Sequence, residues 1–407
     1  MTKTLLIVSG GVQAVHGIQR AKELGYRVVV SDKNPSAPGF EVADDHFLAS
    51  TYHVDETVAA ATHYHETRGR IDGVITIGCD VPLTVASVAH ALRLPGIPLE
   101  AARLAQDKLA MKQCFAAAGI PIPWFSQVRD SAQLLRFAKQ HDFRLVVKPV
   151  DSRGSRGVQR LHPEMDLQHA FDTALAQSPT QRVMVEQYLP GPQISTESIL
   201  INGEGFTPGL SDRNYEYLDR YAPFFIENGG DLPSHLNLKT QEAVKRTAEA
   251  AGRALGISTG NIKGDMVVHQ GKPYVIELAA RASGGYFCTR EIPLNTSVDF
   301  IGCVIKLALG ETVDTADLIP KTQTPVVQRY AFPEPGRVAR IVGLEVARRI
   351  PGVQDIVVTV VEGDDVSEPT HSGCTAAMVL TTGVDVAAAQ AVAARALQAL
   401  RIETVRL

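Results

Sequence analysis

The stretch "DMVVHQGKPYVIELAARASGG", residues 265–285, has the pattern of a β-hairpin with one acidic residue near each end. Asp265 opens one short apolar run, Glu277 closes the other, and Gly271 lies in the turn between them. Both acidic residues stand six positions from Gly271, so a hairpin centred there brings the two carboxylates to opposite positions. A two-residue turn would offset them. Directly opposed like charges destabilise a sheet, so this pattern needs an explanation.

A cation between the two carboxylates is the explanation that the pattern favours. Acidic pairs avoid their repulsion by taking up a proton or by binding a cation. Two carboxylates together with phosphate oxygens form a typical site for Mg²⁺ or Mn²⁺. Arg281, four residues after Glu277, is placed to stabilise the charge on a phosphoryl group in transfer. The alternative is an ion pair between Arg281 and one of the carboxylates at a sheet edge.

Composition sets the outer limits for fold and function. The chain has 407 residues, 45% of them hydrophobic, which is enough for two or three domains. The formal net charge of −4 predicts no nucleic-acid partner and no membrane partner. The N-terminal apolar run is too short for a signal peptide, and we find no stretch of about 18 uncharged apolar residues that would span a membrane. We therefore expect a cytoplasmic protein.

Strand and helix patterns alternate over the first part of the chain, which predicts an α/β fold with an open, mostly parallel sheet. We assign residues 1–98 to this N-terminal domain and residues 99–318 to a central domain with a lid at about 115–185. Residues 319–407 mix strands with one alanine-rich helix, and we expect a small α+β domain there.

Two stretches that contain glycines suggest phosphate binding. "SGGVQAVHG", residues 9–17, follows the first strand, and Asp32 ends the second strand, as in a dinucleotide site. Its spacing differs from G-x-G-x-x-G, so a plain tight turn explains it equally well. "KPVDSRGSRGV", residues 148–158, joins a lysine to glycines that let backbone N–H groups converge on phosphate oxygens. A flexible β-turn is its simpler alternative.

Taken in order, four stretches resemble the ATP-grasp superfamily. They are "DKLAMKQCFAAAGIPIP" at 107–123, "VVKPVDSRGSRGV" at 146–158, "VEQYLPG" at 185–191 and the hairpin at 265–285. The third ends a strand at a Pro-Gly break, where backbone N–H and C=O groups suit a purine edge, although a plain strand end explains it too. The resemblance implies an ATP-grasp fold behind an N-terminal pre-ATP-grasp domain.

The resemblance also implies roles for individual residues. It places Lys108 and Lys148 on ATP phosphates, Asp265 and Glu277 on Mg²⁺, and Arg281 as the catalytic residue that steadies the transferring phosphoryl group. The other nucleotide contacts that it implies are Ser152, Ser155, Arg156, Gly157, Glu186, Gln187, Leu189 and Gln193. Two positions depart from the family pattern. Ala279 stands where many members have a metal-binding asparagine, and Gln193 stands where a glutamate often meets the ribose.

The activity that the resemblance implies is that of an ATP-dependent carboxylate–amine ligase. Such an enzyme forms an amide or peptide bond through an acyl phosphate and releases ADP and phosphate. "IELAARASGG" looks closest to the amino acid ligases, so we expect small amino-acid-like carboxylates and amines as substrates. The substrate contacts that we expect are Arg213, Arg220 and Glu227 of the tyrosine-rich segment 211–230, with Ser283, Gly284 and Gly285. A homodimer is an assembly that is compatible with this resemblance.

Three other functions stay open at this point. A purine-biosynthesis-type or carbamoyl-phosphate-synthase-like ATP-grasp ligase is the nearest. An NAD(P)-dependent oxidoreductase would use Gly10, Gly11 and Asp32, but it leaves the 148–158 loop and the acidic hairpin unexplained. A non-catalytic nucleotide-binding protein conflicts with the acidic hairpin and its arginine.

Overall fold

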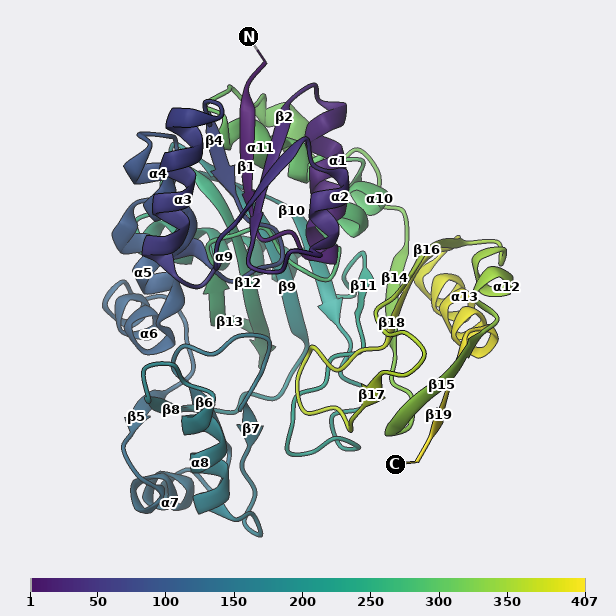
Figure 1. Cartoon of the computed structure of the whole chain (residues 1–407). Coiled ribbons are helices and arrows are strands. Elements are labelled where there is room, and N and C mark those ends of the chain that lie inside the picture. The colour runs from purple at the N-terminus through teal and green to yellow at the C-terminus, as the bar shows by residue number, and fades with distance from the viewer. Residues whose placement is uncertain (1, 407) are drawn as a thin grey trace.

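The N-terminal sheet consists of four parallel strands in the order β3-β2-β1-β4, and the computed structural model describes residues 2–406 of the chain. The apolar run Thr4–Leu5–Leu6–Ile7–Val8 forms β1, which is buried along its whole length because helices cover both faces of the sheet (Figure 1). The strands are β1 (Thr4–Val8), β2 (Arg27–Asp32), β3 (Asp45–Leu48) and β4 (Gly73–Ile75). The helices are η1 (Val12–Ala14), α1 (Val15–Glu23), α2 (Pro38–Val42), α3 (Val54–Thr67) and α4 (Pro82–Ala91).

Two helices, α5 (Leu99–Gln106) and α6 (Lys108–Ala117), lead from this sheet to a separate four-stranded sheet. Asp107 caps α6 by accepting a hydrogen bond from the N–H of Ala110 at 2.8 Å, which fixes where the helix begins. The separate sheet has the order β5-β8-β6-β7 and lies at the lower left in Figure 1. Its elements are β5 (Phe125–Val128), α7 (Ser131–Gln140), β6 (Leu145–Pro149), β7 (Gln159–Arg160), α8 (Leu167–Ala176) and β8 (Val183–Gln187).

The central sheet has eight strands in the order β13-β12-β9-β10-β11-β14-β18-β16. Its last three strands come from the C-terminal part of the chain, so they extend the central sheet instead of forming a sheet of their own. The strands are β9 (Gln193–Ile201), β10 (Glu204–Arg213), β11 (Gly230–Leu232), β12 (Gly260–His269), β13 (Lys272–Ala279), β14 (Val326–Ala331), β16 (Val353–Val358) and β18 (Ala377–Thr382). Helix α9 (Leu238–Ala254) packs on the first strands of this sheet.

The hairpin of β12 and β13 pairs Asp265 with Glu277, as the sequence predicts. Its turn has only two residues, Gln270 and Gly271, both with positive φ (50° and 76°), and His269 pairs with Lys272. A two-residue turn alone would set Asp265 opposite Ile276. A β-bulge between Asp265 and Met266 takes up one residue and moves the partner to Glu277.

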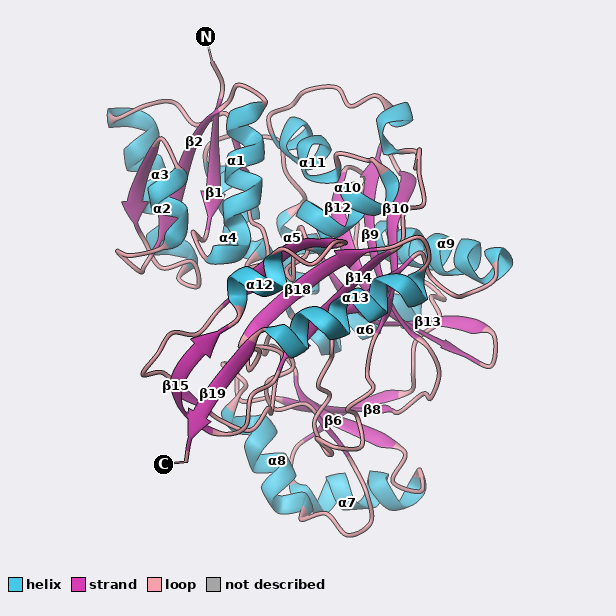
Figure 2. Cartoon of the chain, turned by 90° about the vertical axis from the view of Figure 1, so that its right-hand side faces the viewer, coloured by secondary structure: helices cyan, strands magenta, loops and turns pink. Residues whose placement is uncertain are grey.

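The rest of the chain connects the sheets and covers their edges. Between β13 and β14 lie the π-helical turn η2 (Phe287–Glu291), α10 (Ile292–Thr296), α11 (Phe300–Ala308) and η3 (Thr315–Leu318). The C-terminal part adds the three-stranded sheet β17-β15-β19, and Figure 2 shows α13 lying along β18. Its further elements are β15 (Gly336–Val342), α12 (Leu344–Arg348), β17 (Asp365–Val366), α13 (Val386–Ala399) and β19 (Arg401–Val405).

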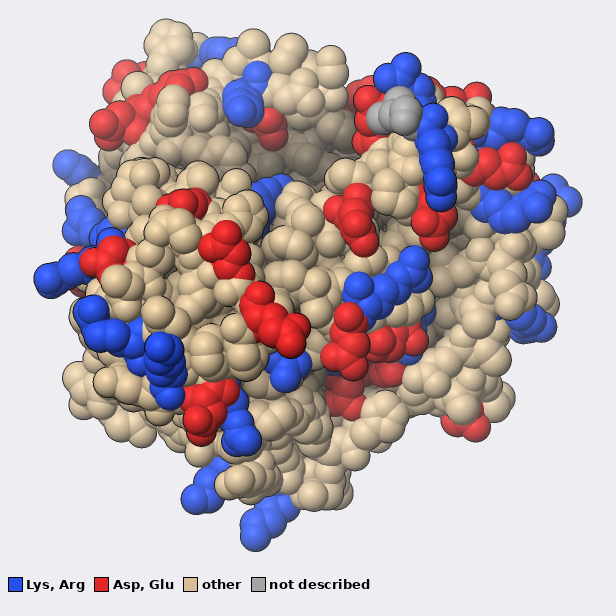
Figure 3. Space-filling model, turned by 90° about the horizontal axis from the view of Figure 1, so that it is seen from below, with Lys and Arg blue, Asp and Glu red and all other residues tan. Residues whose placement is uncertain are grey.

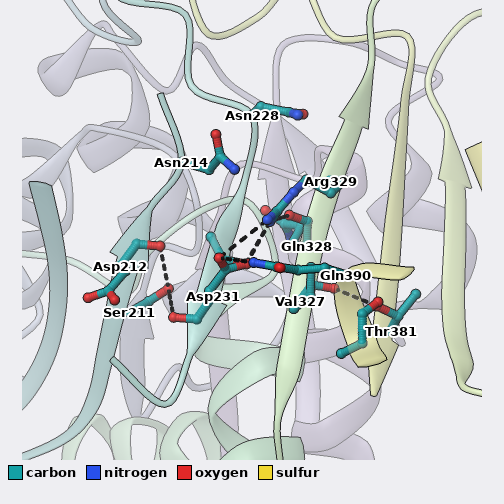
Figure 4. A network of polar contacts seen from close by, with 12 residues as sticks. Ser211, Asp212, Asn214, Asn228, Asp231, Val327, Gln328, Arg329, Thr381 and Gln390 are labelled. Carbon is teal, nitrogen blue, oxygen red and sulfur yellow. Dashed lines mark hydrogen bonds and ion pairs between the residues drawn. The ribbon is translucent and has the colours of Figure 1, made fainter. Parts of the chain in front are cut away.

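A buried ion pair joins the C-terminal strands to β11 (Figure 4). The guanidinium of Arg329 on β14 donates to both carboxylate oxygens of Asp231, at 2.7 and 3.3 Å. Gln390 of α13 donates to the same carboxylate at 2.9 Å. Two elements, β14 and α13, therefore converge on one aspartate, and this fixes β14 beside β11.

Two properties concern nucleic-acid and membrane partners, namely the surface charge and the polarity of the helices. Lys and Arg side chains are interspersed with Asp and Glu on the face that Figure 3 shows from below. Among residues 2–406, every helix is too short or too polar to cross a bilayer.

Candidate active site

The first cavity, about 140 Å³, lies between the separate sheet and the β12–β13 hairpin. We call it the lysine cavity, after Lys108 and Lys148 in its wall. The structure brings together here every nucleotide contact expected from the sequence except Gly157, which stands between two lining residues. The expected residues in its wall are Lys108, Lys148, Ser152, Ser155, Arg156, Glu186, Gln187, Leu189, Gln193, Asp265 and Glu277.

Glu186 anchors the lysines beneath this cavity. Its carboxylate contacts the ammonium groups of Lys148 and of Lys112, the latter at 2.6 Å, and all three side chains are buried. Burial alone would raise the pKa of Glu186, but the two lysines hold it below its usual range. Burial lowers the pKa of Lys112 to about 8, against the opposing effect of Glu186. The side chain of Glu186 thus has a structural task besides the main-chain contacts expected of it.

Asp265 and Glu277 point into the same cavity, and each also contacts protein cations. Arg213 lies 2.5 Å from Asp265, Lys263 contacts the same carboxylate, and Lys108 lies 3.2 Å from Glu277. Burial alone would raise the pKa of Asp265, but Arg213 and Lys263 hold it well below its usual range. Asp265 is therefore held in its charged form, and both side chains are preformed beside basic groups.

The glycine-rich turn between β6 and β7 closes over the lysine cavity. Gly154 and Ser155 both have φ of 62°, a left-handed conformation that a glycine adopts without strain. Other parts of the chain hold this turn on two sides. Arg153 donates to the carbonyl of Asp80 at 2.8 Å, and the N–H of Ser372, from the loop between β17 and β18, donates to the carbonyl of Gly154 at 3.1 Å.

A second cavity of about 290 Å³ adjoins the first, because Gly154 and Arg213 line both. We call it the glutamate cavity, after Glu227 and Glu291 in its wall. The expected substrate contacts that it brings together are Arg213, Glu227, Ser283, Gly284 and Gly285, and Arg281 lines it as well. Gln328 and Tyr330 of β14 complete the wall, so the C-terminal strands are part of this site.

Arg281 is held by a residue that the sequence analysis did not single out. Its Nε lies 3.3 Å from the carboxylate of Asp80, which follows β4 in the N-terminal domain. Burial opposes ionisation of Asp80, but Arg281, Lys108 and Arg153 lower its pKa. The side chain of Asp80 thus orients the arginine, while its carbonyl holds the glycine-rich turn.

Arg220 lines neither cavity, so its expected role as a substrate contact stays a prediction. Its guanidinium lies over the rings of Tyr217 and Tyr221 and 3.5 Å from Glu334, and more than half of the side chain is exposed. Tyr215 and Phe225 of the same segment line the lysine cavity, whereas Arg220 between them faces solvent.

The stretch 9–17, which was one alternative for a dinucleotide site, is held by contacts within the N-terminal part of the chain. The carboxylate of Asp32 accepts a hydrogen bond from the N–H of Gly10 at 2.8 Å and another from the N–H of Asn34 at 2.9 Å. A side chain at Gly10 would meet Val30 at 2.9 Å, so this glycine serves close packing. Gln13 instead accepts a hydrogen bond from the N–H of Gly285 at 3.3 Å, and the loop borders the glutamate cavity.

The family models that match this chain agree with the geometry of the two cavities. Residues 105–285, which hold the acidic hairpin and most of the lysine cavity, match the model of an ATP-grasp domain. The chain therefore contains an ATP-grasp domain at residues 105–285. A second match, over residues 329–405, is to the model described as L-amino acid ligase C-terminal domain 2.

Two solved structures share this ATP-grasp fold along the chain. The L-amino acid ligase from Bacillus licheniformis is 21% identical with a TM-score of 0.84, covering 100% of this chain and 99% of that one. The phosphoribosylglycinamide synthetase from Anaerococcus prevotii is 17% identical with a TM-score of 0.76, covering 100% of both chains. At these identities the likeness concerns the fold.

One curated relative is an uncharacterized protein, y4rH, from Sinorhizobium fredii. It is 27% identical over 290 residues, which cover 70% of this chain and 58% of the relative. The chain therefore matches less than two thirds of the length of that relative.

ATP-grasp enzymes use ATP and Mg²⁺, and the donor set in the lysine cavity fits such an ion. Asp265 and Glu277 supply two carboxylates in register on neighbouring strands. No group of three or more His, Cys, Asp or Glu residues suited to a metal occurs within residues 2–406. Mg²⁺ is commonly bound by one or two carboxylates together with substrate phosphates and water, so two protein ligands are sufficient. With alanine at 279, the partner position of Lys263, this face of the hairpin lacks a third oxygen ligand.

Three residues of these two cavities and their surroundings were missed by the sequence analysis. They differ in how clearly the sequence around them indicates a functional role. Lys112 follows Lys108 by one helical turn in a mostly apolar helix, which is a readable signal. Asp80 comes just after a strand of a parallel sheet, at the edge where ligands bind in such folds. Glu291 stands in "CTREIP", which carries no recognisable motif.

Proposed function

We propose that this protein is an ATP-dependent carboxylate–amine ligase that joins small amino-acid-like substrates. It forms an amide or peptide bond through an acyl phosphate and releases ADP and phosphate. The observation that carries the proposal is that the lysine cavity and the glutamate cavity share Gly154 and Arg213 in their walls. A nucleotide in the first would direct its terminal phosphate toward a carboxylate in the second.

The lysine cavity is assigned to ATP. Lys108 and Lys148 neutralise phosphate charge, and the turn around Ser155 supplies backbone N–H groups over the terminal phosphate. The segment from Glu186 to Leu189 borders the adenine, and Gln193 lies toward the ribose. Asp265 and Glu277 would hold Mg²⁺, which when bound offsets the negative charge of the phosphates.

Arg281 is assigned to the transferring phosphoryl group. It lines the glutamate cavity, and its contact with Asp80 holds the guanidinium in one orientation. A fixed positive charge at this point stabilises the charge that develops on the phosphoryl oxygens. Asp80 is thus a positioning residue, and Arg281 is the catalytic one.

The proposed chemistry needs no nucleophilic side chain. A substrate carboxylate oxygen attacks the γ-phosphorus of ATP, the bond to the bridging oxygen breaks, and ADP leaves. The neutral amine of the second substrate then attacks the acyl carbon, phosphate leaves with the bonding electrons, and the amine loses a proton. Placement of the reactants and stabilisation of charge account for catalysis in such a scheme.

A phosphate-release screen tests the proposal. Purified protein with ATP and Mg²⁺ is offered pairs of the twenty standard L-amino acids, and products are weighed by mass spectrometry. We expect ADP and phosphate to appear with at least one pair, together with a product whose mass is the sum of the two amino acids minus water. EDTA in excess stops release, and added Mg²⁺ restores it.

Two outcomes would overturn this proposal. One is a melting temperature that rises with NAD(P) and not with ATP and Mg²⁺, since a ligand that binds the folded state raises it. The other is turnover only with a ribonucleotide amine or with bicarbonate, which would assign the chain to the purine-type or carbamoyl-phosphate-synthase-like ligases.

A further inference from the structure

The wall of the glutamate cavity contains a short π-helical turn, η2 (Phe287–Glu291). The residue before it, Tyr286, has φ of 66°, so the chain enters the turn in a left-handed conformation. π-Helical turns are rare and are found mostly at functional sites. This turn brings Tyr286, Phe287 and Glu291 together in the cavity wall.

Glu291 is buried and lacks a partner. Its side chain belongs to a residue that is only 3% exposed, and within residues 2–406 no hydrogen bond or ion pair reaches its carboxylate. The nearest charges are mostly of the same sign, because Glu227 and Asp231 lie close to it. Burial, followed by these two neighbours, raises the pKa of Glu291 well above its usual range. Arg329 opposes this only weakly, since its guanidinium is bound to Asp231.

A second group in the same wall is also unsatisfied. Tyr286 is 5% exposed, and its hydroxyl has no hydrogen-bond partner among the described residues. Buried polar groups are normally paired, and a buried charge without a partner is especially unfavourable. An unpaired carboxylate and an unpaired hydroxyl that line one cavity indicate that a ligand supplies the missing partner.

The cavity wall carries charges of both signs. Arg213, Arg281 and Lys263 supply the basic groups, and Arg213 also lines the lysine cavity, whereas Glu291 belongs to η2. Phe287, Val357 and Met378 provide apolar wall between polar groups. A ligand that matches this wall has an anionic end, a cationic end and an apolar part.

We propose that Glu291, assisted by the hydroxyl of Tyr286, binds the ammonium group of an amino acid whose carboxylate is the one activated by ATP. The proposal rests on the function proposed above and narrows its substrate class to zwitterionic amino acids with an apolar side chain. An ammonium group has three donors, so it satisfies the carboxylate and the hydroxyl together. Its charge also offsets the repulsion among Glu291, Glu227 and Asp231.

Replacing Glu291 by glutamine tests this subsite. The substitution keeps the shape of the side chain and removes its ability to become negatively charged. For an amino acid that the wild type turns over, we expect E291Q to raise KM at least tenfold while kcat changes less than threefold. For the corresponding carboxylic acid without the amino group, KM is the same in both proteins. Glu242→Gln on the exposed face of α9 is the matched control, and its KM values equal those of the wild type.

Melting temperatures separate binding from loss of fold. E291Q without substrate melts at or above the wild-type temperature, because an unpaired buried carboxylate has been removed. Amino acids that raise the melting temperature of the wild type raise that of E291Q much less. Tyr286→Phe is the second variant and stands in if E291Q fails to fold, with KM for the same amino acid raised about threefold to tenfold.

The outcomes distinguish this inference from the proposed function. If amino acids are turned over and neither E291Q nor Tyr286→Phe changes KM, the ammonium subsite is wrong and the ligase function stands. If no amino acid is turned over but some stabilise the wild type and not E291Q, the subsite stands and the ligase function is wrong. If no amino acid is turned over or stabilises the wild type, both are overturned.

Discussion

The lysine cavity and the glutamate cavity share part of one wall, yet they treat buried charge in opposite ways. Each acidic residue that lines the lysine cavity, namely Glu186, Asp265 and Glu277, contacts a basic side chain. In the glutamate cavity, Glu227 contacts Arg213, but Glu291 has no partner among the described residues. Every acidic residue of the first cavity therefore has a basic partner, whereas one acidic residue of the second has none among the described residues.

This difference follows from what each cavity is proposed to bind. A triphosphate brings several negative charges, so a cavity for it needs an excess of lysines and arginines that acidic residues keep in place. An amino acid brings one charge of each sign. A cavity for it can leave one carboxylate unpaired until the substrate arrives, at some expense to stability. The four predictions below test this contrast, starting with the largest expected effect.

Glu186→Ala removes the carboxylate that holds the lysine cavity in balance. The change leaves Lys112 and Lys148 buried without a partner, and breaking a buried ion pair in this way costs about 3–5 kcal/mol. We expect the free energy of unfolding in urea to fall by that amount. Glu242→Ala, which breaks an exposed pair with Lys245 on α9, is the control and changes it by less than about 0.5 kcal/mol. Equal effects of the two changes on the free energy of unfolding would show that Glu186 has no structural role.

Arg281→Ala acts in the glutamate cavity, next to the lysine cavity. The loss of a fixed charge at the transferring phosphoryl group lowers kcat by about 10²–10³. The KM for ATP changes less than about threefold, because the contacts in the lysine cavity are intact. Arg340→Ala, an exposed arginine of β15, is the control and keeps wild-type kinetics. Full turnover by Arg281→Ala would show that another group stabilises the phosphoryl oxygens.

Glu197 on β9 is a third buried acid, and it should make stability depend on pH. It is fully buried, one oxygen accepts the N–H of Ser283 at 3.1 Å, and the other has no partner among the described residues. Burial raises its pKa to about 7, against the effect of the hydrogen bond from Ser283. The folded state therefore holds a proton that the unfolded chain releases between about pH 4.5 and 7. As pH rises through this window, the contribution of Glu197 to the free energy of unfolding falls, by at most about 3 kcal/mol.

Glu197→Gln isolates that contribution. Glutamine keeps an acceptor for Ser283 and does not titrate. Urea unfolding should give similar free energies of unfolding for the variant and the wild type at pH 5. At pH 8 the variant should be the more stable of the two. A difference that is the same at both values would mean that Glu197 titrates normally.

Arg220→Ala should have the smallest effect, because Arg220 lies outside both cavities. We expect kcat/KM for each substrate to stay within about twofold of the wild type, since an exposed side chain contributes little. Steady-state kinetics with an amino acid pair from the screen measures it. A tenfold loss of kcat/KM would show that Arg220 does contact a substrate.

Much of the lysine cavity was visible in the sequence because its parts are local. A strand followed by lysine and glycines at 148–158, and acidic residues at equal distances from Gly271, are patterns within single segments. Even there, the register of the hairpin depended on the bulge after Asp265, which the pattern alone did not reveal. Arg220 shows the opposite case, since it follows Arg213 in the same segment but its side chain faces solvent.

The amino-acid sequence by itself predicted the acidic hairpin and the glycine-rich turn, because strand pattern, turn chemistry and charge act over a few neighbouring residues, and the resemblance of its motifs to the ATP-grasp superfamily implied the fold. Only the tertiary structure decided which buried charges have partners. Glu186 meets Lys112 across 74 positions and Arg281 meets Asp80 across 201, and Glu291 meets no cation in the described chain. Whether a buried carboxylate is paired depends on what the fold packs against it from distant segments, and that cannot be read from its neighbours in sequence.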